Sequence, residues 1–192
     1  MTAIDIETVG HILKIGINRP EKKNALTLKL WQAIPDVLTR LTADLRLRVI
    51  IVEGGGNTFC AGADISEFST VRGDPDTALS YENANVDAFL SLRDAPLPTI
   101  AAIHGIAFGG GFGLAAACDI RIATPEAEFA VPAAKLGLAY PVEAMADIVS
   151  AIGVQNTKAL FFTARRFSAA EMQDQGFLHN VITRDDFTAT LA

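Results

Sequence analysis

The sequence has only two cysteines, Cys60 and Cys118, among its 192 residues. Two cysteines are too few for the disulfide framework of a small secreted protein, so they predict a reduced, cytoplasmic setting. Their wide separation also excludes the C-x-x-C spacing of zinc and redox motifs. We therefore expect no metal site, and we expect both side chains to pack as small core residues.

Positive charge is scarce as well. Lys and Arg together number 16 against 22 Asp and Glu, the formal net charge is −6, and no long basic run occurs. This balance argues against a nucleic-acid partner. The N-terminus, MTAIDIETVG, is acidic and is not followed by the apolar segment of a signal peptide, which again favours a cytoplasmic protein.

Charged residues are missing altogether from the stretch 97–118, which is long enough to cross a bilayer. Five glycines lie between Gly105 and Gly113, however, and no basic cluster flanks the stretch. Both features disfavour a transmembrane helix, so we expect no membrane partner.

Half of the residues are apolar and a fifth are charged, which is typical of a folded globular chain. We predict one domain over residues 1–192. Short β-branched runs alternate with amphipathic segments, and this alternation predicts an α/β fold. The expected strands are 4–7, 11–17, 48–53, 99–104, 120–123, 128–131 and 180–183. The expected helices are 28–41, 79–92, 141–152, 156–163 and one that begins at Ser168, while 66–78 is expected to be a mobile loop.

Two glycine-rich turns follow two of the predicted strands: Phe59–Asp64 and Gly109–Gly111. The second turn leads into small residues suited to a helix, whose first N–H groups have no intrahelical partner. If the two strands are neighbours, each turn could direct one backbone N–H at the same oxygen atom, as in an oxyanion hole. A dinucleotide loop is the alternative, since Gly111, Gly113 and Ala116 fit G-x-G-x-x-A and would predict NAD binding. The acidic residue that this motif needs about twenty positions later is not clearly present.

Five segments in order resemble the crotonase (enoyl-CoA hydratase/isomerase) superfamily: 18–26 (NRPEKKNAL), 59–65 (FCAGADI), 104–111 (HGIAFGGG), 118–123 (CDIRIA) and 129–138 (FAVPAAKLGL). The resemblance implies a crotonase-like spiral of ββα units, an acyl-CoA ligand, and a homotrimer or hexamer. It implies oxyanion donors on the backbone of Ala63 and Gly110. The residues that it places near the substrate are Lys22, Lys23, Ala25, Ala61, Asp64 and Ile65. Coenzyme A would enter as part of the substrate, with no separate cofactor.

The sequence departs from the family at the groups that move protons. Hydratases of the family carry glutamates at the positions of Gly113 and Ala133, and other members carry an aspartate at the position of Pro141; none of these three residues can transfer a proton. Glu143 is the candidate base near the expected acyl group, although the first turn of a helix also favours a glutamate. Tyr140 could donate a hydrogen bond or line the pocket.

These features predict an acyl-CoA-binding protein that stabilises a thioester enolate but hydrates enoyl-CoA slowly. Two alternatives stay open: a double-bond isomerase that uses Glu143, and an acyl-CoA binder without catalysis. Relatives usually continue with several more helices after the last strand, whereas this sequence stops at Ala192. We therefore expect the domain to lack that C-terminal helical segment.

Overall fold

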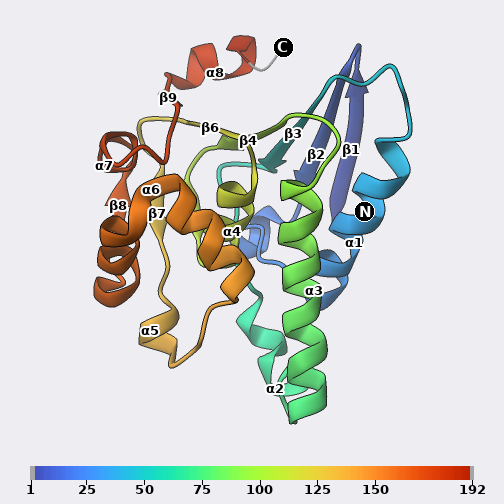
Figure 1. Ribbon diagram of the computed structural model, residues 1–192. Helices are drawn as coiled ribbons and strands as arrows, with labels where there is room; N and C mark the ends of the chain where they lie inside the picture. The colour runs from blue at the N-terminus through green and yellow to red at the C-terminus, as the bar shows by residue number, and fades with distance from the viewer. Residues whose placement is uncertain (1–2, 191–192) are drawn as a thin grey trace.

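A computed structural model describes residues 3–190 of the chain (Figure 1). The strands are β1 (Ile4–Val9), β2 (Ile12–Ile17), β3 (Val49–Gly54), β4 (Thr99–Ile103), β5 (Ile106–Phe108), β6 (Ile120–Ala123), β7 (Glu128–Ala130), β8 (Phe167–Ser168) and β9 (Asn180–Val181). The α-helices are α1 (Leu28–Leu41), α2 (Phe68–Val71), α3 (Pro75–Arg93), α4 (Gly110–Ala117), α5 (Ala133–Leu136), α6 (Val142–Thr163), α7 (Ala169–Asp174) and α8 (Arg184–Thr190). Two 3-10 helices are η1 (Pro20–Lys22) and η2 (Ile65–Glu67).

The strands form two sheets. The larger has the order β1-β2-β3-β4-β6-β9, and only its β1–β2 hairpin is antiparallel. The smaller has the order β5-β7-β8. Successive strand pairs divide between the sheets: β4 and β6 join the larger, while β5 and β7, which follow them, join the smaller. The chain therefore winds as a spiral, and the predicted α/β class is confirmed.

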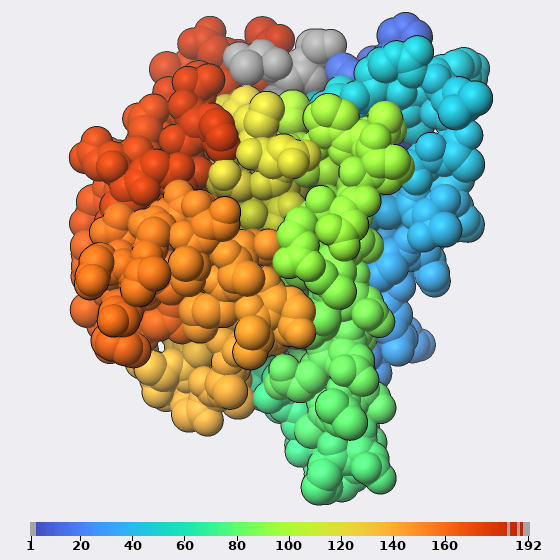
Figure 2. All heavy atoms as spheres, in the orientation of Figure 1, coloured from blue at the N-terminus to red at the C-terminus, as the bar shows by residue number. Residues whose placement is uncertain are grey.

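Helices cover both faces of the larger sheet. On one face, α1 packs on α3, α3 on α4 and α4 on α6, around a core that includes Trp31, Phe89 and Phe112. On the other face, Phe187 of α8 packs with Ile51 and other residues of the sheet. Figure 2 shows α2 and the start of α3 (green) projecting at the lower end of the molecule, with the segment around α5 (gold) also at that end. The pocket described below lies between these segments.

The prediction of a mobile loop over 66–78 is wrong, because this region contains α2 and the first turn of α3. Asp74 caps α3 by accepting hydrogen bonds from the backbone N–H groups of Asp76 and Thr77, and Pro75 occupies the first helical position. An acidic cap followed by proline is a helix-start signal that the sequence interpretation missed. Residues 65–72 thus form an ordered wall rather than a loop.

The strand expected at 99–104 and the glycine run beyond it are separated by an unpredicted strand, β5. Gly105 (φ +62°) turns the chain between them, and a Cβ at this position would lie 2.2 Å from the carbonyl oxygen of Asn57. Only glycine permits both the left-handed backbone and this close approach. The turn transfers the chain from one sheet to the other, which places β5 directly before the glycine run.

Candidate active site

The two glycine-rich turns are held together by a short parallel bridge between Cys60 and Ala107. The Cys60 N–H donates to the Ile106 carbonyl, and the Phe108 N–H donates to the Cys60 carbonyl, each at 2.9 Å. The strands that lead toward the turns, β3 and β4, are parallel neighbours, as the oxyanion interpretation requires. Ala63 lies three residues after Cys60, and Gly110 lies three residues after Ala107. The bridge therefore fixes the positions of the two turns relative to each other.

Contact between the turns is so close that side chains are excluded. Gly62 has φ +92°, and a Cβ there would lie 2.6 Å from the Phe108 carbonyl oxygen and 2.9 Å from the Gly110 nitrogen. A Cβ on Gly110 would lie 2.8 Å from the ring of Trp31 and 3.7 Å from the Ala63 nitrogen. The Trp31 ring is buried and packs against Gly110 of the second turn. Its Nε1 donates a hydrogen bond to the hydroxyl of Tyr81 at 3.1 Å.

Ala63 and Gly110 both line one pocket, which lies between α2, α3 and the segment around α5. Neither of their N–H groups has a protein acceptor in the part of the chain that the structure describes. Gly110 is the first residue of α4, so its N–H lies at the positive end of the helix dipole. Two unpaired amides on one pocket wall are chemically suited to bind an oxygen that carries negative charge. A charged side chain is not needed for that binding.

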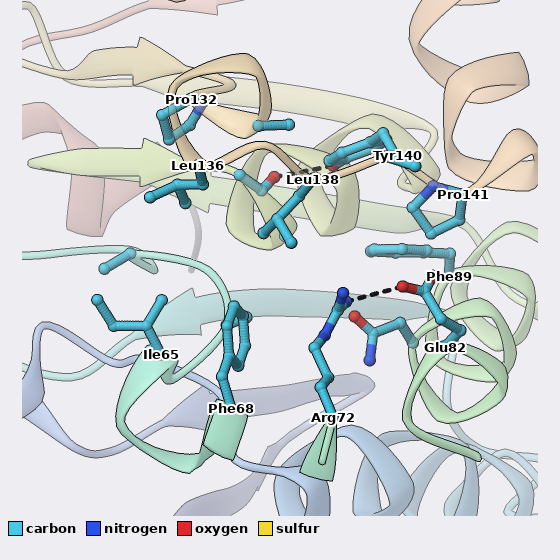
Figure 3. A pocket seen from close by; sticks show the side chains of 17 residues that line it. Ile65, Phe68, Arg72, Glu82, Phe89, Pro132, Leu136, Leu138, Tyr140 and Pro141 are labelled. Carbon is cyan, nitrogen blue, oxygen red and sulfur yellow. Dashed lines mark hydrogen bonds and ion pairs between the residues drawn. The ribbon is translucent and has the colours of Figure 1, made fainter. Parts of the chain in front are cut away.

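The pocket has an empty volume of about 670 Å³, which includes the part open to solvent. Figure 3 shows Ile65, Pro132 and Leu136 on one side, and Arg72 with Glu82 on the other. The lining residues come from four segments: Ala61, Ala63, Ile65, Phe68 and Arg72; Glu82, Asn85 and Phe89 of α3; Gly109 and Gly110; and Pro132, Ala133, Leu136, Leu138, Ala139, Tyr140 and Pro141.

The structure brings five of the predicted site residues to this pocket: Ala61, Ala63, Ile65, Gly110 and Tyr140. Lys22 and Lys23 are exposed. Their loop lies next to the pocket, because the N–H of the pocket residue Ala61 donates to the Lys23 carbonyl at 2.9 Å. Ala25 is buried beneath the same loop and does not line the pocket. The lysine loop and the first glycine-rich turn are thus direct neighbours.

Asp64 does not line the pocket, although the resemblance places it among the substrate-binding residues. Its carboxylate accepts a hydrogen bond from the Ser66 hydroxyl at 2.7 Å and pairs with Arg19 at 3.0 Å. The Ser66 hydrogen bond, followed by the Arg19 contacts, lowers the pKa of Asp64 below its usual value. Its observed role is to hold the first turn against the loop that contains Arg19.

Glu143 lies in the first turn of α6, where it is exposed and does not line the pocket. The structure therefore gives no geometric support to Glu143 as the base. Ala133 and Pro141, at two of the positions where the resemblance implies a carboxylate, do line the pocket but have no ionisable group.

Tyr140 fills the space beside Gly113, the remaining carboxylate position. A Cβ on Gly113 would lie 2.6 Å from the Tyr140 hydroxyl oxygen and 2.9 Å from the ring of Phe89. The Tyr140 hydroxyl donates to the Gly109 carbonyl at 2.9 Å, and burial raises the pKa of Tyr140 well above its usual value. The phenol thus stays protonated at neutral pH and braces the turn that precedes α4.

The glycines of the dinucleotide motif serve internal packing. A Cβ on Gly111 would lie 2.3 Å from the Cys60 carbonyl oxygen, and Gly113 is covered by Tyr140 and Phe89. Gly113 holds the position of the second glycine of the motif, which lets the backbone approach the pyrophosphate in a dinucleotide loop, but here Tyr140 and Phe89 occupy that space. The NAD interpretation consequently lacks its structural basis.

Sequence reasoning missed several residues of the site. Arg72 and Glu82 form an ion pair of 2.8 Å on the pocket wall, and Asn85 lies on the same helix as Glu82. Only the helix start at Asp74–Pro75 could have indicated that α2 and α3 form a wall. Residues 3–190 hold no group of three His, Cys, Asp or Glu side chains that could bind a metal ion, and none of their helices is long and apolar enough to span a membrane.

Comparison with known proteins places these features in a family. The family model described as "Enoyl-CoA hydratase/isomerase" matches residues 7–191. The mitochondrial Δ(3,5)-Δ(2,4)-dienoyl-CoA isomerase of Mus musculus is 32% identical over 186 residues, which cover 92% of this chain and 57% of that protein. The mevalonyl-coenzyme A hydratase of Aspergillus fumigatus is 33% identical over 180 residues, covering 94% of this chain and 66% of that protein. This chain therefore spans between half and two thirds of the length of both relatives.

Solved structures of this family have the same fold as this chain. An enoyl-CoA hydratase/isomerase family protein from Hyphomonas neptunium superposes with a TM-score of 0.94 at 34% identity, covering 98% of this chain and 72% of the other. An enoyl-CoA hydratase/carnithine racemase from Magnetospirillum magneticum gives a TM-score of 0.95 at 31% identity, covering 100% and 72%. The predicted crotonase-like fold is confirmed, and the chain belongs to the enoyl-CoA hydratase/isomerase (crotonase) superfamily.

Proposed function

We propose that this chain binds an acyl-CoA thioester and stabilises its enolate, with the thioester oxygen between the amides of Ala63 and Gly110. The proposal rests on one observation: two N–H groups without a protein acceptor line the same pocket wall, and the Cys60–Ala107 bridge fixes the turns that contain them. Preorganised donors of this kind bind an oxygen more strongly as its negative charge increases. Supporting this substrate class, two of its relatives carry names that specify CoA thioesters.

The coenzyme A portion is proposed to lie along the loop that contains Lys22 and Lys23. Both lysines are exposed, and their loop is hydrogen-bonded to the turn that leads from Ala61 to Ala63. Exposed ammonium groups can contact phosphates as point charges. The acyl group would then extend into the pocket, whose walls between Ile65 and Leu138 are largely apolar.

Proton transfer is the weak part of this site. The glutamate that lines the pocket, Glu82, is already paired with Arg72, and Glu143 is outside the pocket. We therefore propose slow hydration of enoyl-CoA. An acyl-CoA binder without catalysis is the second candidate, favoured by Gly113, Ala133 and Pro141 at the carboxylate positions.

Calorimetry with crotonyl-CoA and with free CoA, followed by mass analysis of the incubated ligand, tests the proposal. We expect saturable binding of crotonyl-CoA that is tighter than binding of CoA. We also expect hydration far below the rate of ordinary enzymes, about 10 s⁻¹. Exchange of the α-hydrogens of butyryl-CoA in D₂O, followed by NMR, reports enolate stabilisation separately from hydration. Absence of thioester binding would refute the proposal, whereas binding without exchange would support the non-catalytic candidate.

A further inference from the structure

One wall of the otherwise apolar pocket is polar. Arg72 at the end of α2 and Glu82 in α3 are both partly exposed there, with side-chain exposures of 22% and 35%. They line the same pocket as Ala63 and Gly110, on the side away from Ile65, Pro132 and Leu136 (Figure 3). One ligand can therefore reach the two amides and this ion pair at the same time.

Packing holds the Arg72 guanidinium in place. Its central carbon lies 4.9 Å from the centre of the Phe68 ring and 5.1 Å from that of the Tyr81 ring, both within cation–π range. Its Nε is buried without a hydrogen-bond partner among residues 3–190. The guanidinium is thus a fixed feature of the wall, with its Nη atoms at the end that meets Glu82.

The Arg72–Glu82 pair has unused hydrogen-bonding capacity. The arginine side chain has five N–H donors, and the one hydrogen bond that the Arg72 side chain donates within the described residues runs from Nη2 to Glu82 Oε1 at 2.8 Å. The second carboxylate oxygen of Glu82 accepts no hydrogen bond from these residues. The pocket wall therefore presents a donor and an acceptor side by side.

The pair is electrically balanced, and this determines the kind of ligand group that suits it. A carboxylate near Arg72 would also lie near Glu82, and repulsion between the two anions would offset much of the attraction. An alkyl chain would cover the pair and remove water from it without replacing the lost hydrogen bonds. A hydroxyl group avoids both costs, because it can accept from Arg72 and donate to Glu82.

Resting on the proposed function, we propose that the pocket selects acyl-CoA substrates whose acyl chain carries an uncharged hydroxyl group, bound between Arg72 and Glu82. Hydrogen bonds to charged partners imply a preference of about tenfold or more over an alkyl chain of equal length. The ion pair is then a specificity determinant and takes no part in proton transfer.

Calorimetry with matched ligands tests this proposal: 6-hydroxyhexanoyl-CoA, heptanoyl-CoA of the same chain length, and adipoyl-CoA with a terminal carboxylate, together with the next two longer members of each series. We expect one hydroxyacyl-CoA to bind about tenfold more tightly than its alkyl and carboxylate counterparts. Equal or tighter binding of the alkyl chain overturns the proposal, and so does tighter binding of the carboxylate. Failure of all the thioesters to bind would instead overturn the proposed function itself.

Variants assign the preference to the pair. Arg72→Met should reduce the preference to about twofold or less while heptanoyl-CoA still binds, and Arg72→Lys and Glu82→Gln should reduce it partially. Arg93→Met is the matched control, because Arg93 forms a similar 3.1 Å ion pair with Asp147 outside the pocket. Thermal unfolding of each variant verifies that it is folded. A preference retained in all three pocket variants overturns the assignment to Arg72 and Glu82.

Discussion

The two sides of this pocket differ in what they are made of. On the side of Ala63 and Gly110, the useful groups are backbone amides. A Cβ on Gly62, Gly110 or Gly111 would lie less than 3 Å from a neighbouring atom, so these three positions favour glycine. On the side of Gly113, Ala133 and Pro141, where the resemblance implies carboxylates, the residues have no ionisable group. The backbone donors of the proposed function are therefore in place, whereas the acid and base side chains that the resemblance implies are not.

Under the proposed function, thioester binding and proton transfer depend on separate parts of the fold. Backbone donors are fixed by strand pairing and close packing, so they persist in any sequence that retains the glycines and the bridge. Acid and base groups are single side chains, and each can be lost without disturbing the turns. Tyr140 illustrates this, because it fills the space beside Gly113 and still braces Gly109.

Gly62→Ala is expected to have the largest effect on stability and on crotonyl-CoA binding, because it inserts a side chain between the two glycine-rich turns. The new Cβ would clash with the Phe108 carbonyl oxygen and the Gly110 nitrogen at a residue with positive φ. Strain and overpacking together should lower the free energy of unfolding by about 2–4 kcal/mol. Denaturant unfolding measures this loss, and calorimetry should show weaker crotonyl-CoA binding.

Gly10→Ala provides the matched control for that variant. Gly10 also has positive φ (+59°), but nothing lies within 4 Å of its hypothetical Cβ. Gly10→Ala should lower the free energy of unfolding by only about 1 kcal/mol and leave crotonyl-CoA binding unchanged. Equal losses in both variants would contradict the close packing of the two turns.

Gly113→Ala should have the next largest effect, about 1–3 kcal/mol, because its Cβ meets the Tyr140 hydroxyl and Phe89. Tyr140→Phe removes the hydroxyl and should cost about 1 kcal/mol through the lost hydrogen bond to Gly109. Because the hydroxyl causes part of the clash, the double variant should lose less than the sum of the two. A double-mutant cycle by denaturant unfolding should give a coupling of about 1 kcal/mol; strict additivity would mean that Tyr140 does not occupy this space.

A pH series tests whether the backbone side depends on any titrating group. Burial raises the pKa of the Cys60 thiol beneath the first turn from 9.0 to about 12, and burial also raises the pKa of Tyr140. Crotonyl-CoA affinity should therefore stay constant, within about twofold, between pH 6 and 9. A steep change between pH 7.5 and 9, above the range in which a phosphate monoester of CoA titrates, would indicate an ionisable group beside the amides of Ala63 and Gly110.

Above pH 9 the same two residues should lower stability. The unfolded state loses their protons at ordinary pKa values, whereas the folded state retains them, so the unfolded state binds fewer protons. The free energy of unfolding should thus decrease as the pH rises from 9 toward 12. Denaturant unfolding across this range measures the slope, and a rise in stability would contradict the burial of both groups.

Glu143→Gln is expected to have the smallest effect. Its side chain is exposed and outside the pocket, so thioester affinity, α-hydrogen exchange and stability should each remain close to those of the unchanged chain. Loss of exchange with binding retained would instead support the isomerase that uses Glu143. The measurements are the same calorimetry and NMR as above.

Much of the fold could be predicted because its signals are local. The amphipathic run 28–41 forms the predicted helix, α1, which Thr27 caps and which continues through Pro35. Strand β5 was not predicted, since it depends on the turn at Gly105 that carries the chain from one sheet to the other. The trimer or hexamer stays a prediction.

The two glycine-rich turns and the family could be identified from the sequence alone, because each is encoded in short runs of consecutive residues. Which side chains face the pocket became clear only from the folded chain. Asp64 pairs with Arg19, Glu143 stays outside, and Arg72 meets Glu82 on a shared wall. These outcomes depend on how α2, α3 and the segment before α6 pack together, and packing between distant segments leaves no local pattern in the sequence.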